Sequence, residues 1–183
     1  MNSYVRYKRV ETPEELQQIL ELQRLNIPES LSDFEREKQG FVTVHHNLEI
    51  LNAMNDKCPH VIATYNDKVI GYTLCMIKKF RDSIEVLQPM FQQIEKLANL
   101  DQSFIVMGQV CVAKKFRRKG VFRGLYIHMK NELKSKFNNI ITEVDKQNTR
   151  SLNAHYAIGF KVLYSYRSNN QDWEILGWNI NNN

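Results

Sequence analysis

Features that would direct the protein to a membrane, a metal or an oxidising compartment are absent from the sequence. No stretch approaches the ~18 consecutive apolar residues that a membrane-spanning helix needs, and the first eight residues contain no apolar signal region. There are only three cysteines, and their spacing fits neither a zinc site nor a CxxC motif. The sequence therefore predicts a cytoplasmic protein that uses no metal, with Cys58, Cys75 and Cys111 as reduced core thiols.

Glycine and proline are also scarce, with seven glycines and four prolines in 183 residues. Neither gathers in a linker-like stretch, and no internal repeat is visible. Hydrophobic residues make up 43% of the chain, enough for a full core. We therefore predict a single domain over residues 1–183, with the asparagine-rich last residues frayed. The net charge of +5 suits an anionic ligand, nucleic acid or a membrane surface without distinguishing among them.

The hydrophobic pattern changes between strand and helix periods along the chain. The clearest helix start is at Thr12, which acts as the cap, with Pro13 in the first helical position and Glu15 completing a capping box. The pattern predicts helices from residue 13 to before Pro28 and at 32–39, 42–54, 87–97, 121–137 and 148–158, and strands at 4–10, 61–65, 69–77, 104–112, 140–144, 160–166 and 173–180. Hairpins and strand–helix–strand crossovers both occur in this order, which predicts an α/β or α+β fold on a mixed sheet.

A basic turn follows the apolar strand at 104–112. Six of the ten residues from Lys114 to Arg123 are lysine or arginine, and a helical pattern starts near Val121. Backbone N–H groups at the positive end of a helix dipole, surrounded by cations, can hold a polyanion such as a diphosphate. Gly120 would let the backbone approach the phosphates without a Cβ in the way. An ordinary solvated turn and a nucleic-acid contact are the alternatives, although the second lacks exposed aromatic platforms among the charges.

Two sequence blocks carry a resemblance to a known family. The block Arg117-x-x-Gly120-x-Phe122 resembles the Gln/Arg-x-x-Gly-x-Gly/Ala signature of the GNAT (Gcn5-related N-acetyltransferase) superfamily. The second block is similar to the family's Leu-Glu-Val…Asn-x-x-Ala…Tyr-x-x-x-Gly-Phe and reads Glu143-Val144, then Asn148-x-x-Ser151, then His155-x-x-x-Gly159-Phe160. The order of predicted elements also resembles that fold. The resemblance implies a GNAT fold, with a mixed, mostly antiparallel central sheet of about seven strands flanked by helices.

The resemblance implies acetyl-CoA as the cosubstrate. By residue-to-residue match, the diphosphate would lie on the basic turn, and the main chain of the preceding strand would bind the pantetheine amides as an added strand does. Asn148 would both cap its helix and contact the cofactor. The cofactor-binding residues implied in this way are Val110, Cys111, Val112, Arg117, Arg118, Lys119, Gly120, Val121, Phe122 and Asn148.

Acetyl transfer to an amine needs a base for the ammonium and an acid for the leaving thiolate. Glu143 resembles the family's strand glutamate and is the implied base; the alternative is a glutamate that points outward or caps the next element. His155 takes the place of the family's acid tyrosine and is the implied acid; the alternative is a hydrogen-bonded structural histidine. Tyr156 is a poorer candidate, because it is turned about 100° round the helix.

The resulting hypothesis is an N-acetyltransferase that acetylates a small-molecule or peptide amine directly in a ternary complex. A CoA-binding sensor without turnover, a transferase for longer acyl-CoAs and a nucleic-acid-binding domain are the alternatives. We expect neither nucleic acid nor membrane as a partner, and a homodimer stays open. In the segments that would select the acceptor, we expect His45 and His46 to be a solvent-facing pair on a helix, and Tyr164, Tyr166, Trp173 and Trp178 to pair across a hairpin.

Overall fold

A seven-stranded sheet forms the centre of the protein in the computed structural model, which describes residues 4–26, 45–97 and 103–181. The strand order is β1-β2-β3-β4-β5-β7-β6, and only β4 and β5 run parallel. The mixed, mostly antiparallel sheet confirms the predicted fold. The strands are β1 (Arg6–Arg9), β2 (Val61–Tyr65), β3 (Lys68–Met76), β4 (Phe104–Val112), β5 (Asn139–Asp145), β6 (Lys161–Ser168) and β7 (Gln171–Asn179).

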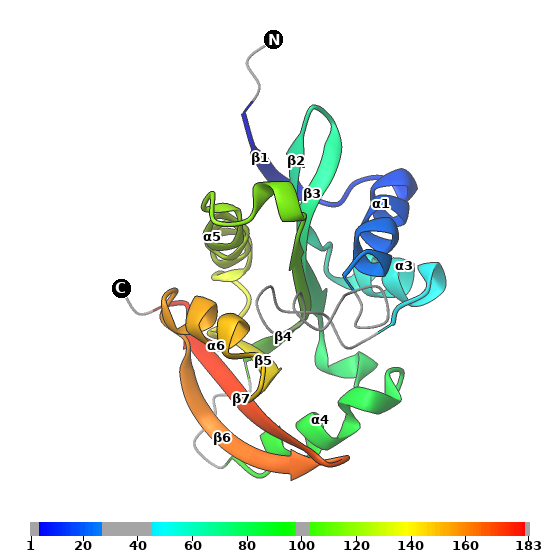
Figure 1. Cartoon of the computed structure of the whole chain (residues 1–183). Coiled ribbons are helices and arrows are strands. Elements are labelled where there is room, and N and C mark those ends of the chain that lie inside the picture. Colours follow the sequence, from blue (N-terminus) through cyan, green and yellow to red (C-terminus); the bar gives the residue numbers. More distant parts are fainter. Residues whose placement is uncertain (1–3, 27–44, 98–102, 182–183) are drawn as a thin grey trace.

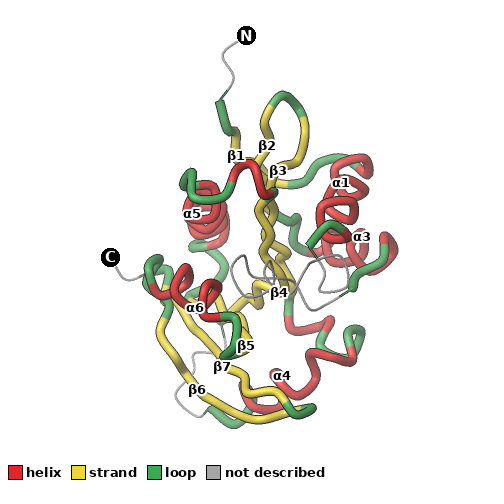
Figure 2. Tube along the Cα trace, in the orientation of Figure 1, coloured by secondary structure: helices red, strands yellow, loops and turns green. Residues whose placement is uncertain are grey.

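Helices cover both faces of the sheet (Figures 1 and 2). α5 and α6 pack on one face, and α1, α3 and α4 pack on the other, so that two apolar cores lie on either side of the strands. No helix in the described ranges is long and apolar enough to cross a membrane. The helices are α1 (Pro13–Arg24), α3 (Leu48–Lys57), α4 (Gln88–Ile94), α5 (Val121–Leu133) and α6 (Thr149–Tyr156), with short 3₁₀ turns η2 (Lys78–Phe80), η3 (Glu85–Leu87) and η4 (Lys114–Phe116).

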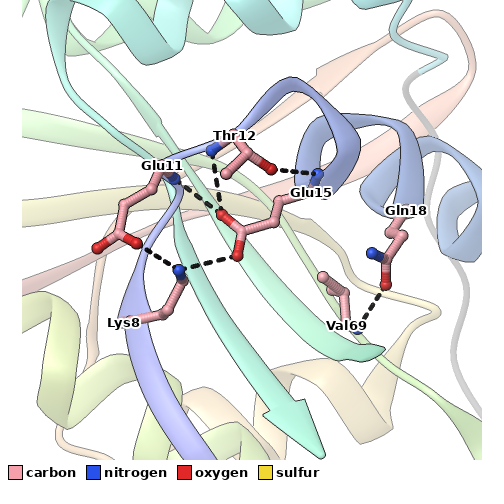
Figure 3. A network of polar contacts seen from close by, with 6 residues as sticks. All are labelled: Lys8, Glu11, Thr12, Glu15, Gln18 and Val69. Atoms are coloured by element: carbon pink, nitrogen blue, oxygen red, sulfur yellow. Dashed lines mark hydrogen bonds and ion pairs between the residues drawn. The ribbon is translucent and has the colours of Figure 1, made fainter. Parts of the chain in front are cut away.

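The start of α1 follows the predicted capping box (Figure 3). The Glu15 backbone N–H donates to Thr12 Oγ1 at 3.4 Å, and the Thr12 N–H donates to Glu15 Oε2 at 3.3 Å. Lys8 on β1 adds ion pairs to Glu11 at 2.6 Å and to Glu15 at 2.9 Å, so the cap also fastens the helix to the first strand. Local chemistry therefore fixes both the start and the direction of α1.

The helix predicted at 42–54 is wrong in its start. α3 begins only at Leu48, because Asn47 is its N-cap and accepts from the Ile50 N–H at 2.9 Å. His45 and His46 therefore precede the helix instead of lying on it. The helix predicted at 32–39 lies outside the described residues, and α4 and α5 are shorter than predicted.

The sheet opens between β4 and β5. Their parallel ladder contains three pairs, Phe104↔Asn139, Ile105↔Ile140 and Val106↔Ile141, although both strands continue well beyond it. A register shift against β3 accompanies the opening: Cys75 pairs with Met107 but Thr73 pairs with Val110, so β4 holds one extra residue there. The bulge turns β4 away from β5 and leaves a gap that is filled by neither strand's backbone.

Candidate active site

A groove of about 340 Å³ lies where β4 ends, between the basic turn and α6. Nine of the ten predicted cofactor residues line it, from Val110 on β4 to Asn148 at the start of α6. Lys119 does not; its ammonium lies over the Phe116 ring, 5.7 Å from the centroid. Sequence analysis missed further lining residues, among them Asn26, Arg123, Arg150, Ser151 and Ala154.

The turn presents its backbone to the groove. Gly120 is the N-cap of α5 and has φ = 80°, and Arg118 has φ = 60°, so two left-handed residues flank Lys119. Left-handed residues set among right-handed ones turn successive N–H groups toward one side, which creates a concavity for anions. A Cβ built at Gly120 would meet no atom within 4 Å and would project into open space. Glycine adopts a left-handed conformation without strain, so it suits position 120 and would also suit position 118, where this chain has arginine.

Arginine side chains line the same groove, and hydrogen bonds hold one of them in place. Arg117 donates from Nε to the Val112 carbonyl at 3.0 Å and from Nη2 to Asn26 Oδ1 at 2.5 Å. Arg150, in the first turn of α6, lies close enough to Arg117 and Arg118 that burial and these two charges lower its pKa. Three like charges that converge on one groove repel one another, and a bound polyanion would relieve that repulsion.

Cys111 lies on β4 but on the face away from α5, in the core under α1. Burial raises the pKa of its thiol to about 12. A thiol in that state is a poor nucleophile, so Cys111 contributes to the groove through its backbone.

A second, smaller cavity of about 60 Å³ fills the gap between β4 and β5. It shares Val110, Asn148 and Ser151 with the groove, so the two cavities adjoin. Glu143 from β5 lines it, together with Asp145 and with Trp173 on β7. Both predicted catalytic residues, Glu143 and His155, are lining residues of this cavity.

Glu143 has the properties of a base. Burial raises the pKa of its carboxyl group, and a hydrogen bond from Tyr166 lowers it; burial has the larger effect, and the pKa is about 7. Tyr166, on β6, reaches across β7 and donates from its Oη to Glu143 Oε2 at 2.5 Å. A carboxylate with a pKa near 7 is half-ionised near neutral pH and can accept a proton there. Tyr166 itself lies opposite Trp173 in the β6–β7 ladder, as predicted, but the rest of the expected aromatic pairing is wrong. Tyr164 lies opposite Ile175, and Trp178 packs against the rings of Tyr126 and Phe160.

Removing the Tyr166 hydroxyl should raise the pKa of Glu143 further. The hydrogen bond favours the charged carboxylate, so Tyr166→Phe leaves burial unopposed and moves the ionisation of Glu143 to higher pH, by about one unit. An NMR titration of glutamate carboxyl carbons measures this pKa without any acceptor. Tyr164→Phe, at an exposed position of the same strand, is the control. An unchanged Glu143 pKa in Tyr166→Phe would show that the hydroxyl does not act on the base.

His155 lies inside the protein, with 1% of its surface exposed. Its Nδ1 donates to the Ser151 carbonyl at 2.7 Å, and its Nε2 accepts from the Tyr126 hydroxyl at 2.7 Å. Its ring also packs edge-on against Phe122 and Phe160. Burial lowers the pKa of His155 to about 4, so the ring is neutral at pH 7. Both ring nitrogens are hydrogen-bonded, and the neutral ring carries no second proton to donate to a thiolate. The geometry therefore favours a structural histidine over the predicted acid.

We expect His155→Ala to reduce stability more than cofactor binding. The substitution removes a packed ring and leaves the Tyr126 hydroxyl without its partner, which together should lower the free energy of unfolding by about 2–4 kcal/mol. Chemical denaturation measures this loss, and calorimetry at a temperature where the variant is folded measures acetyl-CoA affinity. Tyr156→Ala, at an exposed site on the same helix, is the matched control. Full stability with lost turnover would instead restore His155 as the acid.

A buried polar chain lies on the other side of β4. Gln109, turned toward α1 by the bulge, accepts from Tyr72 Oη at 2.5 Å and from Gln23 Nε2 at 2.7 Å. Gln23 is also 3.0 Å from His46 Nδ1 and accepts from the His46 N–H. His46 is therefore buried, so the expected solvent-facing histidine pair is wrong; only His45 is exposed. Gln109 lines the small cavity, so this chain connects α1 to the site.

A mixed sheet that opens beside a basic glycine turn, with a half-buried glutamate in the gap, places the chain among the acetyltransferases. More particularly, the chain belongs to the Acetyltransferase (GNAT) family, whose model matches residues 16–160. No curated protein sequence matches the chain significantly.

Solved structures share the fold at low identity. The ribosomal-protein-S18-alanine N-acetyltransferase of Escherichia coli has 13% identity and a TM-score of 0.66, with 97% of this chain and 94% of that one covered. Salmonella typhimurium yncA, solved with acetyl-CoA, has 13% identity and a TM-score of 0.63, with coverage of 98% and 95%. Arabidopsis thaliana Naa50, in complex with the bisubstrate analogue CoA-Ac-MVNAL, has 16% identity and a TM-score of 0.64, with coverage of 95% and 97%.

Proposed function

We propose that this protein transfers the acetyl group of acetyl-CoA to a primary amine in a ternary complex. The observation that carries the proposal is the junction of two cavities: a groove of about 340 Å³ lined by arginines adjoins a small pocket that Glu143 lines. The diphosphate would lie on the turn at Gly120, the pantetheine along Val110–Val112, and the thioester beside Glu143. No metal is required for this chemistry.

The chemistry follows from the charges of the small cavity. An acceptor amine arrives as an ammonium, which Glu143 and Asp145 attract. Glu143, with a pKa of about 7, takes a proton from the ammonium directly or through water. The amine nitrogen then attacks the thioester carbonyl carbon, the carbon–sulfur bond breaks and the thiolate leaves, and the nitrogen releases its second proton to solvent as the amide forms. His155 is engaged elsewhere, so we infer that solvent protonates the thiolate.

Thermal unfolding with matched ligands tests the binding half of the proposal. A ligand at 100 times its dissociation constant adds ~2.7 kcal/mol to the stability of the protein it binds, so acetyl-CoA and CoA should both stabilise it and a short oligonucleotide should not. The stabilisation should weaken as salt is raised, because exposed charges are screened beyond ~8 Å at physiological ionic strength. Stabilisation by the oligonucleotide alone would overturn the proposal in favour of nucleic-acid binding.

A screen for acetyl-CoA consumption tests the catalytic half. Amines, amino acids, polyamines, aminoglycosides and peptide N-termini are each supplied as acceptor, and product mass identifies the acetylated group. Propionyl-CoA and longer thioesters in the same assay test the choice of acyl group. The buried, fully bonded His155 favours one second candidate, a CoA-binding sensor without turnover. Tight CoA binding with no consumption for any acceptor would select that alternative.

A further inference from the structure

Two cysteine thiols meet away from the groove, on the face of the sheet that α5 covers. Cys58 ends α3, where its N–H donates to the Met54 carbonyl at 3.0 Å, and Cys75 lies within β3. Val61 pairs with Thr73 across β2 and β3, which brings positions 58 and 75 near each other, and both side chains belong to the same apolar cluster. At this range a hydrogen bond between the two thiols acts on the pKa of each. Neither lines the groove or the small cavity. Cys58 retains 6% exposure and Cys75 none, so a small reagent reaches Cys58 first.

A guanidinium group is directed at this pair from β1. Arg9 Nη2 donates to Cys58 Sγ at 3.4 Å. Arg9 Nε is buried and has no hydrogen-bond partner among the described residues, and no carboxylate there pairs with Arg9. Arg9 as a whole is half-buried, but its buried, unpaired Nε makes the missing anion unfavourable. A thiolate at Cys58 would supply the missing negative charge.

The same surroundings separate the two thiols chemically. The hydrogen bond from Cys75, with the charges of Arg9 and Lys136, lowers the pKa of Cys58 against the effect of burial. That hydrogen bond and burial raise the pKa of Cys75 well above its usual range. Arg9 and its surroundings therefore favour a thiolate at Cys58, the slightly exposed position, over one at Cys75 behind it. This is the arrangement of an attacking and a resolving cysteine.

We propose that Cys58 and Cys75 form a peroxide-sensitive dithiol site that closes to a disulfide. The Cys58 thiolate attacks one oxygen of hydrogen peroxide; the S–O bond forms, the O–O bond breaks, and the leaving hydroxide takes a proton to become water. Cys75 then attacks the Cys58 sulfur; the S–S bond forms, the S–O bond breaks, and hydroxide leaves with the Cys75 proton as a second water. Two thiols are oxidised by two electrons in total, and one peroxide is reduced. The site is independent of acetyl transfer.

Peroxide treatment of the whole protein tests the disulfide. After the oxidised protein is unfolded in denaturant and its free thiols are blocked with iodoacetamide, peptide mapping by mass spectrometry should find Cys58 joined to Cys75, with Cys111 alkylated as an internal control. In Cys75→Ser the reaction should stop at the first step, and dimedone should label Cys58 as a sulfenic acid. Peroxide that leaves all three cysteines alkylated, or that oxidises Cys111 as readily, would overturn the proposal.

Alkylation kinetics test the role of Arg9. A free cysteine with a pKa of about 8.5 is only about 3% thiolate at pH 7, so loss of the guanidinium in Arg9→Leu should slow alkylation of Cys58 about tenfold. Arg6→Leu, at an exposed position of the same strand, should not change the rate. The parent protein gives a result that needs no variant: its Cys58 rate should level off below pH 8.5. A rate that titrates like that of a free thiol would refute the assignment.

Discussion

Replacing Gly120 by glutamate is expected to reduce the affinity for acetyl-CoA at least about 100-fold, equivalent to ~2.7 kcal/mol of binding free energy. The new side chain projects into the open space that the proposed diphosphate occupies, and its charge repels the phosphates. It also takes the place of the anion at the N-terminus of α5, where the N–H groups are directed. Isothermal titration calorimetry measures the loss, with circular dichroism as the check of folding.

Gly120→Ala is the matched control for this experiment. Alanine carries the same unfavourable left-handed conformation at φ = 80°, worth roughly 1–2 kcal/mol of stability, but adds neither bulk nor charge to the groove. The alanine variant should therefore bind far better than the glutamate variant at equal stability. If the glutamate variant binds within about threefold of the parent, the diphosphate does not lie on this turn.

Replacing Glu143 by glutamine should lower turnover by about 10²–10⁴-fold while cofactor affinity is kept. The amide preserves the shape of the side chain and its contact with Tyr166 but cannot accept a proton from the ammonium. Steady-state kinetics with an acceptor from the amine screen measure turnover. Because the pKa of Glu143 is about 7 and only the carboxylate acts as base, the parent rate should rise with pH through about 7 and then level off.

The pH profile separates this role from a structural one. Glu143→Gln should abolish the rising limb that ends near pH 7, whereas Glu132→Gln, at an exposed site on α5, should keep both the rate and the profile. If Glu143→Gln retained the rising limb, another group would be the base. Asp145, which lines the same cavity, would then be the residue to replace.

Features that depend on local chemistry could be predicted from the sequence. The cap of α1 at Thr12 and the cap of α6 at Asn148 each involve atoms only three residues apart, so the residue types suffice to identify them. The basic turn can also be predicted, because its charges and Gly120 are contiguous in the sequence. Asn47 is an equally local signal: it lies three residues before the amide it caps, and it indicates a start of α3 at Leu48.

Contacts between distant segments could not be predicted in the same way. Arg117 reads as a free cation in the sequence, yet it is bonded to Asn26, which lies 91 positions earlier. The sequence predicts His46 as a surface residue. In the structure the bulge in β4 directs Gln109 toward Gln23, and Gln23 in turn is the buried hydrogen-bond partner of His46. His155 was placed correctly on α6, but its hydrogen bond to Tyr126 depends on how α6 packs against α5. The sequence therefore predicts residues that come together around two adjoining cavities, but not the environment of individual side chains.

In the part of the chain that the structure describes, three ladder pairs and the backbone hydrogen bonds of Asn138 and Asn139 to the Ser103 carbonyl connect the two halves of the sheet, β1 to β4 on one side and β5 to β7 on the other. So short a parallel ladder makes a natural hinge, and opening along it would widen the gap that holds Glu143. A cosubstrate bound across both cavities would contact both halves of the sheet and hold them together. Amide hydrogen exchange at residues 104–106 and 139–141 should therefore be faster than within the long β6–β7 ladder, and should slow when acetyl-CoA binds.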